Sequence, residues 1–179
     1  MATKVTPQRR DFYVEELDYK SSLSENLFTK VGEATQFIND RQLLHHEFKY
    51  NGYFVGVGGG EDGVLAVPFN YDLAGIAVHL KETGTSLITT VDIHHVSSNG
   101  TDNGTILSTK LNIDYSEPNG STFFVNLLDS SSSAPASSNS SLPVFSTTQF
   151  NAGDSMRVDI DANATGAENL SIHLYYRPR

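Results

Sequence analysis

Hydrophobic and polar residues alternate along most of the chain after residue 46. The alternation recurs in short segments that are separated by turn sequences such as Asn-Gly, Ala-Gly-Asp and Thr-Gly. Alternation with a period of two predicts strands with one dry and one wet face, as in antiparallel sheets. The predicted strands are 47–55, 64–69, 76–81, 87–95, 107–113, 123–127, 145–150, 156–161 and 170–177.

Strands at this spacing, with no helical pattern between them, predict a mainly β fold over 46–179. We expect an antiparallel two-sheet sandwich and favour a jelly roll. Asn51-Gly52 predicts a hairpin turn within the first strand segment. The core is expected to include residues of three strands that we predict to be adjacent: Val91, Ile93, Val158, Ile160, Ile172 and Leu174.

Two long loops are expected at the ends of the sandwich, at 97–104 and 129–141. The second contains eight serines among thirteen residues. Because such a segment has almost nothing apolar to bury, we expect it to be mobile.

The first 45 residues lack the alternation. Residues 1–20 predict an extended N-terminal arm that becomes ordered only against a partner. Ser22 and Glu25 fit a capping box, and the apolar residues that follow predict one amphipathic helix over 21–45. The sequence leaves open whether this helix packs on its own sandwich or on other copies. Its apolar stripe consists of Leu23, Leu27, Val31, Ala34 and Ile38.

Composition narrows the classes of protein. The net charge is −9, of which residues 50–179 carry five Lys/Arg and thirteen Asp/Glu, a net of −8. This acidic surface argues against nucleic acid as a partner. The chain has no Cys, which excludes disulfides and thiolate metal sites. With neither a membrane-spanning apolar run nor an N-terminal signal pattern, we expect no membrane association and a cytosol-like compartment.

Residues 58–63 match the dinucleotide-binding fingerprint G-x-G-x-x-G. That fingerprint binds a pyrophosphate at the N-terminus of the helix that follows the glycines. Here the following residues, 64–68, have the pattern of a strand, and Glu61 and Asp62 would repel phosphates. We therefore interpret the segment as a loop and expect no cofactor.

His79, His94 and His173 occupy polar positions of three predicted strands, and Asp92 lies two residues before His94. If these strands were neighbours, the side chains could form a three-histidine metal site. The alternative is that they are surface residues of half-solvated strands. We favour this second interpretation and assign no metal site.

Residues 159–163, Asp-Ile-Asp-Ala-Asn, are similar to the opening of a calcium-binding loop. Ala164 stands where that loop needs glycine, and Leu170 stands where it needs a bidentate glutamate. A looser calcium site in a sandwich loop remains open. The alternative, which we favour, is the end of a strand with outward acidic residues.

Serine, histidine and carboxylates are abundant, but the sequence contains no Gly-x-Ser-x-Gly nucleophile elbow. A glycosidase with paired carboxylates needs a deep cleft, which a small sandwich with short loops rarely supplies. We therefore predict a protein that is not an enzyme and assign no catalytic residues.

Several segments carry a recognisable pattern. Residues 145–148 read F-S-T-T, residues 151–161 read N-A-G-D-S-M-R-V-D-I-D, and residues 166–174 read G-A-E-N-L-S-I-H-L. Upstream, residues 67–76 read V-P-F-N-Y-D-L-A-G-I, residues 90–93 read T-V-D-I, and residues 31–42 read V-G-E-A-T-Q-F-I-N-D-R-Q. Together these segments resemble parts of small β-sandwich (jelly-roll-like) virion proteins of tailed bacteriophages.

The resemblance implies a head decoration protein or a tail, fibre or baseplate part. Its motifs concern packing and turns: Gly153 and Asp154 should form a turn, and Asp159 and Asp161 should face water. No catalytic residue comes with the resemblance.

Our first hypothesis is an accessory structural protein of a bacteriophage virion, namely a capsid decoration (cement) protein anchored through its N-terminal segment. Expected partners are the major capsid protein or other virion proteins, and further copies of the chain in a homo-oligomer. We expect it in the virion, assembled in the host cytoplasm. The alternative is a tail-fibre or baseplate module that binds host surface carbohydrate, where Tyr71, Tyr115 or Tyr175 could stack on a sugar.

Overall fold

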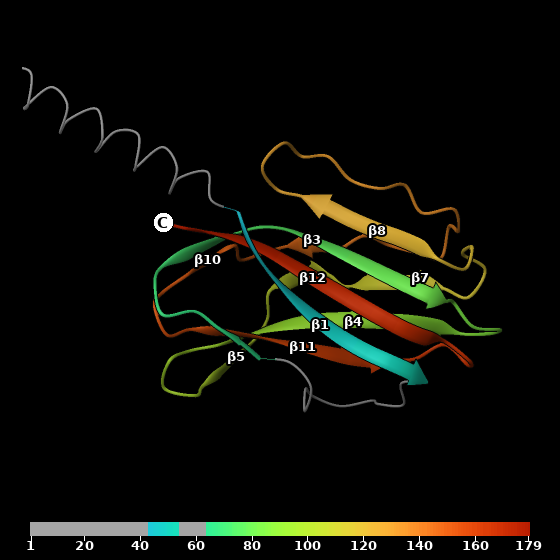
Figure 1. Cartoon of the computed structure of the whole chain (residues 1–179), viewed down its shortest axis with the longest axis horizontal. Helices are drawn as coiled ribbons and strands as arrows, with labels where there is room; N and C mark the ends of the chain where they lie inside the picture. The colour runs from blue at the N-terminus through green and yellow to red at the C-terminus, as the bar shows by residue number, and fades with distance from the viewer. Residues whose placement is uncertain (1–42, 54–63) are drawn as a thin grey trace, which may run out of the picture. The chain divides into compact units, whose positions relative to one another are not determined.

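The computed structural model describes residues 43–53 and 64–179 (Figure 1). The chain divides into two units, Met1–Arg41 and Gln42–Arg179, and the described residues belong to the second. The expected arm at 1–20, nearly all of the expected helix at 21–45 and the glycine-rich loop at 58–63 therefore lie outside the described residues.

The described part of the chain consists of β-strands joined by turns and loops, with no helix, so a mainly β fold is confirmed. All pairings between the strands are antiparallel, as predicted. The strands are β1 (Leu44–Tyr53), β2 (Val64–Ala66), β3 (Tyr71–Glu82), β4 (Ile88–Val96), β5 (Asp102–Thr105), β6 (Leu107–Thr109), β7 (Leu111–Asp114), β8 (Ser121–Asn126), β9 (Val144–Phe145), β10 (Gln149–Phe150), β11 (Ser155–Ala162) and β12 (Glu168–Pro178).

The strands form two five-stranded sheets and one small sheet. In the first sheet, called sheet A here, the order is β1-β12-β3, and both β8 and β10 pair with the remaining edge of β3. In the second, sheet B, the order is β2-β11-β4, and both β5 and β7 pair with β4. Strands β6 and β9 form the two-stranded sheet.

One hydrophobic core joins the two sheets. Val78 and Ile172 from sheet A belong to the same buried cluster as Ile93 and Val158 from sheet B, so the sheets pack face to face. Each such side chain stabilises the fold by about 1.5–3 kcal/mol when it is fully buried. The six predicted core residues are confirmed, with at most 6% of any of them exposed: Val91, Ile93, Val158, Ile160, Ile172 and Leu174. The predicted adjacency of their strands holds for β4 and β11, which pair in sheet B, but is wrong for β12, which lies between β1 and β3 in sheet A.

Strand β1 begins at Leu44, two residues before the expected start of the sandwich at residue 46. The period-two pattern already operates there: Leu44 and His46 are partly buried, whereas His45 and Glu47 are exposed. Two polar histidines in succession conceal this alternation in the sequence, because neither of them has an apolar side chain.

The expected hairpin turn at Asn51-Gly52 is wrong. Strand β1 pairs with the single strand β12 from Leu44 to Tyr53, and a register shift after Tyr50 marks a bulge at these residues. Gly52 has a φ of +70°, and its amide donates to the side-chain oxygen of Asn169 at 2.9 Å. A bulge also uses the left-handed conformation that Asn-Gly favours, so the same dipeptide serves a different feature.

The predicted strand 107–113 is interrupted at Lys110. Leu107–Thr109 form β6 and pair with β9, whereas Leu111–Asp114 form β7 and pair with β4. Thr109 shares the alternating row of Leu107 and Leu111, but it is exposed whereas both leucines are buried. The chain therefore passes from the two-stranded sheet to sheet B at Lys110, although the alternation of apolar and polar residues in the sequence continues through this point.

The serine-rich loop 129–141 is attached to the sandwich by hydrogen bonds. The buried carboxylate of Glu117 accepts the backbone amides of Ala136 at 3.1 Å and Ser137 at 2.8 Å. Asn112 and Ser141 exchange two backbone hydrogen bonds of 3.0 Å each. The expected mobility rested on the lack of apolar groups in this loop; hydrogen bonds to polar groups of the sandwich hold it instead.

Candidate functional site

The outer face of sheet B carries a cluster of charged side chains centred on Asp92. Only 1% of Asp92 is exposed, although it lies on the polar row of β4. The ammonium group of Lys110 lies 2.7 Å from its Oδ2 and 2.5 Å from Oδ2 of Asp161. Oδ1 of Asp92 accepts hydrogen bonds from the hydroxyl of Thr105 and from the amide of Ile93.

These contacts keep Asp92 ionised in the folded protein. Burial raises the pKa of Asp92, but the hydrogen bonds from Lys110, Thr105 and Ile93 together outweigh burial and lower it below its usual value. In turn, the hydrogen bonds to Asp161 and Asp92 raise the pKa of the Lys110 ammonium. Asp92 and Lys110 therefore form an ion pair in which both groups stay charged at neutral pH.

A second ionic contact joins β11 and β5 to the same face. Arg157 binds Asp159 through two nitrogens, Nε at 2.9 Å and Nη2 at 2.8 Å, and its Nη2 also lies 3.0 Å from Asp102. His94 places its Nδ1 3.1 Å from Asp102. The expectation that Asp159 faces water is wrong, because the guanidinium covers its carboxylate and leaves 5% of the residue exposed.

The sandwich does not bring the three candidate histidines together. His94 belongs to β4 in sheet B, whereas His79 and His173 belong to β3 and β12 in sheet A. All three occupy polar positions of the two packed sheets. His94 therefore lies on the outer face of sheet B, and His79 and His173 lie on the opposite outer face, that of sheet A. Within residues 43–53 and 64–179, no group of three or more His, Cys, Asp or Glu side chains is arranged to hold a metal ion.

The two acids of the calcium-like segment are engaged by basic side chains. Asp159 binds Arg157, and Asp161 binds Lys110. Residues 155–162 form β11 and leave no separate loop there. Each carboxylate thus has a cationic partner in the position where a calcium ion would otherwise neutralise it.

The turn motif at Gly153-Asp154 is confirmed. Gly153 has a φ of +85°, and its amide donates to the carbonyl of Val67 at 2.8 Å. The Asp154 carboxylate accepts the amides of Asn151 at 3.0 Å and Ser98 at 3.1 Å. Burial raises the pKa of Asp154, but the bonds from Asn151, His95 and Ser98 lower it overall. This motif therefore ties the turn before β11 to the loop that follows β4.

The three tyrosines proposed to stack on a sugar differ in accessibility. Tyr71 is fully buried and stacks on Phe150 with ring centroids 5.0 Å apart, so it cannot bind a ligand at the surface. Tyr115 is 45% exposed. Tyr175 is partly buried on the outer face of sheet A, where its ring stacks on His45 at a centroid distance of 5.9 Å.

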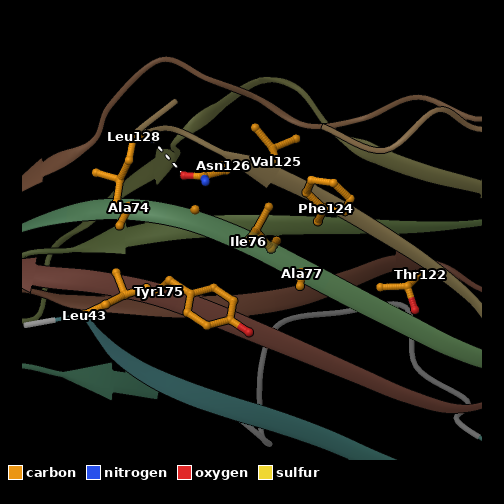
Figure 2. Close-up of a pocket in the computed structure, with 11 residues that line it drawn as sticks. Leu43, Ala74, Ile76, Ala77, Thr122, Phe124, Val125, Asn126, Leu128 and Tyr175 are labelled. Carbon is orange, nitrogen blue, oxygen red and sulfur yellow. Dashed lines mark hydrogen bonds between the residues drawn. The ribbon is translucent and has the colours of Figure 1, made fainter. Parts of the chain in front are cut away.

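An apolar groove of about 340 Å³ lies on the outer face of sheet A. Strand β3 crosses its floor with Ala77, as Figure 2 shows, and the small residue Gly75 of the same strand also lines it. Tyr175 stands on the β12 side and Phe124 on the β8 side. Its full lining consists of Leu43, Ala74, Gly75, Ile76, Ala77, Thr122, Phe124, Val125, Asn126, Leu128 and Tyr175.

Two backbone features form this groove. The pairing of β3 with β12 passes from Gly75 opposite Tyr175 to Leu73 opposite Tyr176, so Ala74 is the extra residue of a bulge. At the next position, a Cβ on Gly75 would lie 2.5 Å from the carbonyl oxygen of Val125. Only glycine therefore lets β8 approach β3 this closely. The sequence motif at 67–76 contains this glycine, but periodicity gave no sign of the groove.

The likenesses of this chain to known proteins are with solved structures. No family model and no curated protein matches the sequence. Among solved structures, the chain is similar to one in the capsid of Ralstonia phage GP4 (16% identity, 78% of this chain and 86% of that one, TM-score 0.47) and to one in the cyanophage Pam1 capsid asymmetric unit (14%, 77% and 86%, TM-score 0.38). It is also similar to the SPBc2 prophage-derived protein YomS (15%, 75% and 95%, TM-score 0.33). All three TM-scores lie below 0.5, so these likenesses do not define a family for the chain.

Proposed function

We propose that the chain is an accessory structural protein of a bacteriophage virion and that it serves as a capsid decoration protein. The observation that carries this proposal is the position in the fold of the sequence motifs that resemble those of phage virion proteins. Gly75 sets the approach of β8 to β3, Gly153-Asp154 forms the turn before β11, and the last two motif segments form β11 and β12 at the centre of the two sheets. The motifs thus build the frame of the sandwich.

The strand order supports a jelly roll. Among the eight strands β1, β2, β3, β4, β7, β8, β11 and β12, the first, eighth, third and sixth follow one another in sheet A. The second, seventh, fourth and fifth follow one another in sheet B. Two four-stranded sheets in this order, made of successive antiparallel connections, define the jelly roll that viral capsid proteins often use.

The proposed role is not catalytic. The charged residues that could act as acids or bases on sheet B are paired with one another: Asp92 with Lys110, and Asp159 with Arg157. General acid–base catalysis requires a group that can transfer a proton near neutral pH, whereas these side chains hold one another in ion pairs. The proposed partners are the major capsid protein or other virion proteins and further copies of the chain, with the N-terminal segment as the anchor.

A tail-fibre or baseplate module that binds host surface carbohydrate is the second candidate. The observation that favours it is the ring cluster on sheet A, where Tyr175 stacks on His45 and His173 at centroid distances of 5.9 and 6.5 Å. Aromatic platforms of this kind can stack on sugar rings, and jelly rolls also occur in lectins.

Quantitative mass spectrometry of purified virions separates the two candidates. A decoration protein should be present in a number of copies comparable to the capsid protein, whereas a fibre or baseplate module should be present in few. Absence of the chain from purified particles would refute both. A variant without residues 1–20 should keep its fold and fail to join the particle; undiminished incorporation would assign the anchor to another surface.

A further inference from the structure

The outer face of sheet A exposes a concentrated apolar patch. Three large apolar side chains on the rim of the groove are exposed: Leu43 by 50%, Phe124 by 38% and Leu128 by 52%. They are three of the seven exposed large apolar residues in the described part of the chain, and the other four line no part of this groove. An apolar depression with apolar residues projecting beside it is typical of a protein-binding surface.

We propose that this patch, defined by the groove and its rim residues Leu43, Phe124 and Leu128, binds the same patch of a second copy of the chain. A contact between two identical surfaces requires each surface to offer both a projection and a recess. Here the exposed side chains of Phe124 and Leu128 stand beside the recess over Ala77, so one patch carries both parts (Figure 2). A recess of about 340 Å³ has room for a side chain of this size from the partner.

The distribution of charge favours a second copy at this face. The chain has a net charge of −9, so two copies repel each other in most orientations. None of the eleven residues that line the groove is charged. By contrast, the outer face of sheet B carries Asp92, Asp102, Asp159 and Asp161 against Lys110 and Arg157. Two copies that meet through this patch therefore bring no charged side chain of the groove lining against one another.

The lining also argues against a sugar in the recess itself. Gly75 and Ala77 offer no polar side chain on the floor, and Asn126 turns its Oδ1 to the amide of Leu128 at 2.9 Å. A sugar needs directed hydrogen bonds in addition to ring stacking, whereas an aliphatic or aromatic side chain needs only apolar contact. This inference deepens the self-association named under the proposed function and rests on it, but it does not depend on a location in the virion.

Analytical ultracentrifugation of the full chain over a range of concentrations tests the proposal. The wild-type chain should self-associate, and Phe124→Asp should weaken association at least about tenfold, because it removes an apolar contact and places like charges in the interface. Val144→Asp is the matched control: Val144 is 53% exposed and lies in β9, away from the groove. It should associate as the wild type does, and both variants should keep the wild-type fold, as judged by their far-ultraviolet circular dichroism spectra.

The absence of cysteine from the chain permits a second measurement. A flexible thiol cross-linker should join two copies of Asn126→Cys, which lies in the groove, but not two copies of Thr109→Cys, which is exposed on β6. A monomeric wild-type chain, equal weakening by Phe124→Asp and Val144→Asp, or cross-linking only at residue 109 would overturn the proposal. Virion incorporation is measured separately, so loss of this contact and loss of the proposed function are distinguishable.

Discussion

Replacement of Lys110 by methionine tests whether the ionic cluster on sheet B stabilises the fold. Asp92 is 1% exposed, and its Oδ2 lies 2.7 Å from the Lys110 ammonium and 3.4 Å from Nε2 of His94. Removing one partner of a fully buried pair costs about 3–5 kcal/mol. Because 40% of the Lys110 side chain is exposed, water screens part of this interaction, and we expect a loss of about 2 kcal/mol.

The assay is equilibrium unfolding in urea at pH 7, with Lys81→Met as the control. Lys81 is an exposed lysine on the outer face of β3, and its replacement should change the free energy of unfolding by less than about 0.5 kcal/mol. The double variant with Asp92→Asn should lose less than the sum of the two single losses, since the unpaired charge is gone. Equal effects of the two lysine replacements, or strict additivity in the double variant, would refute the reasoning.

Three further predictions concern other features. Gly75→Ala should destabilise the fold by about 1–3 kcal/mol in urea unfolding, because its Cβ would clash with the carbonyl of Val125; an unchanged midpoint contradicts the close approach. Glu117→Ala should raise amide hydrogen exchange throughout loop 129–141, and unchanged exchange would show that Glu117 is not needed to hold it. The lowered pKa of Asp92 adds stability that is present above about pH 4 and lost as the pH falls further; a urea midpoint constant to about pH 3 contradicts this.

The sequence alone predicted those parts of the fold in which the polarity of each residue determines whether its side chain faces the core or water. The alternation of β4, β11 and β12 identified the strands and their core residues, because most side chains that face the core are apolar. The alternation wrongly predicted that Asp159 faces water, since the burial of a polar side chain also depends on whether a neighbouring side chain covers it. Arg157 reaches Asp159 only because the two lie two positions apart on the same face of β11.

The groove shows a different limit. Its floor exists because β3 lies between β12 and β8, and because the bulge at Ala74 sets Gly75 opposite Tyr175. Strand order and register are properties of long-range pairing that periodicity does not contain. The glycine in the motif at 67–76 marked the position, but without the partner strand its purpose could not be inferred.

The way in which loop 129–141 is held has a consequence for engineering. Glu117 binds the backbone amides of Ala136 and Ser137, not their side chains. The identity of the loop's outward residues therefore matters little to the attachment, and Ala134, Ala136 and Ser138 are exposed. Short foreign epitopes substituted at these positions should be displayed in a fixed conformation, and if the chain decorates a capsid, a regular array of antigens would result.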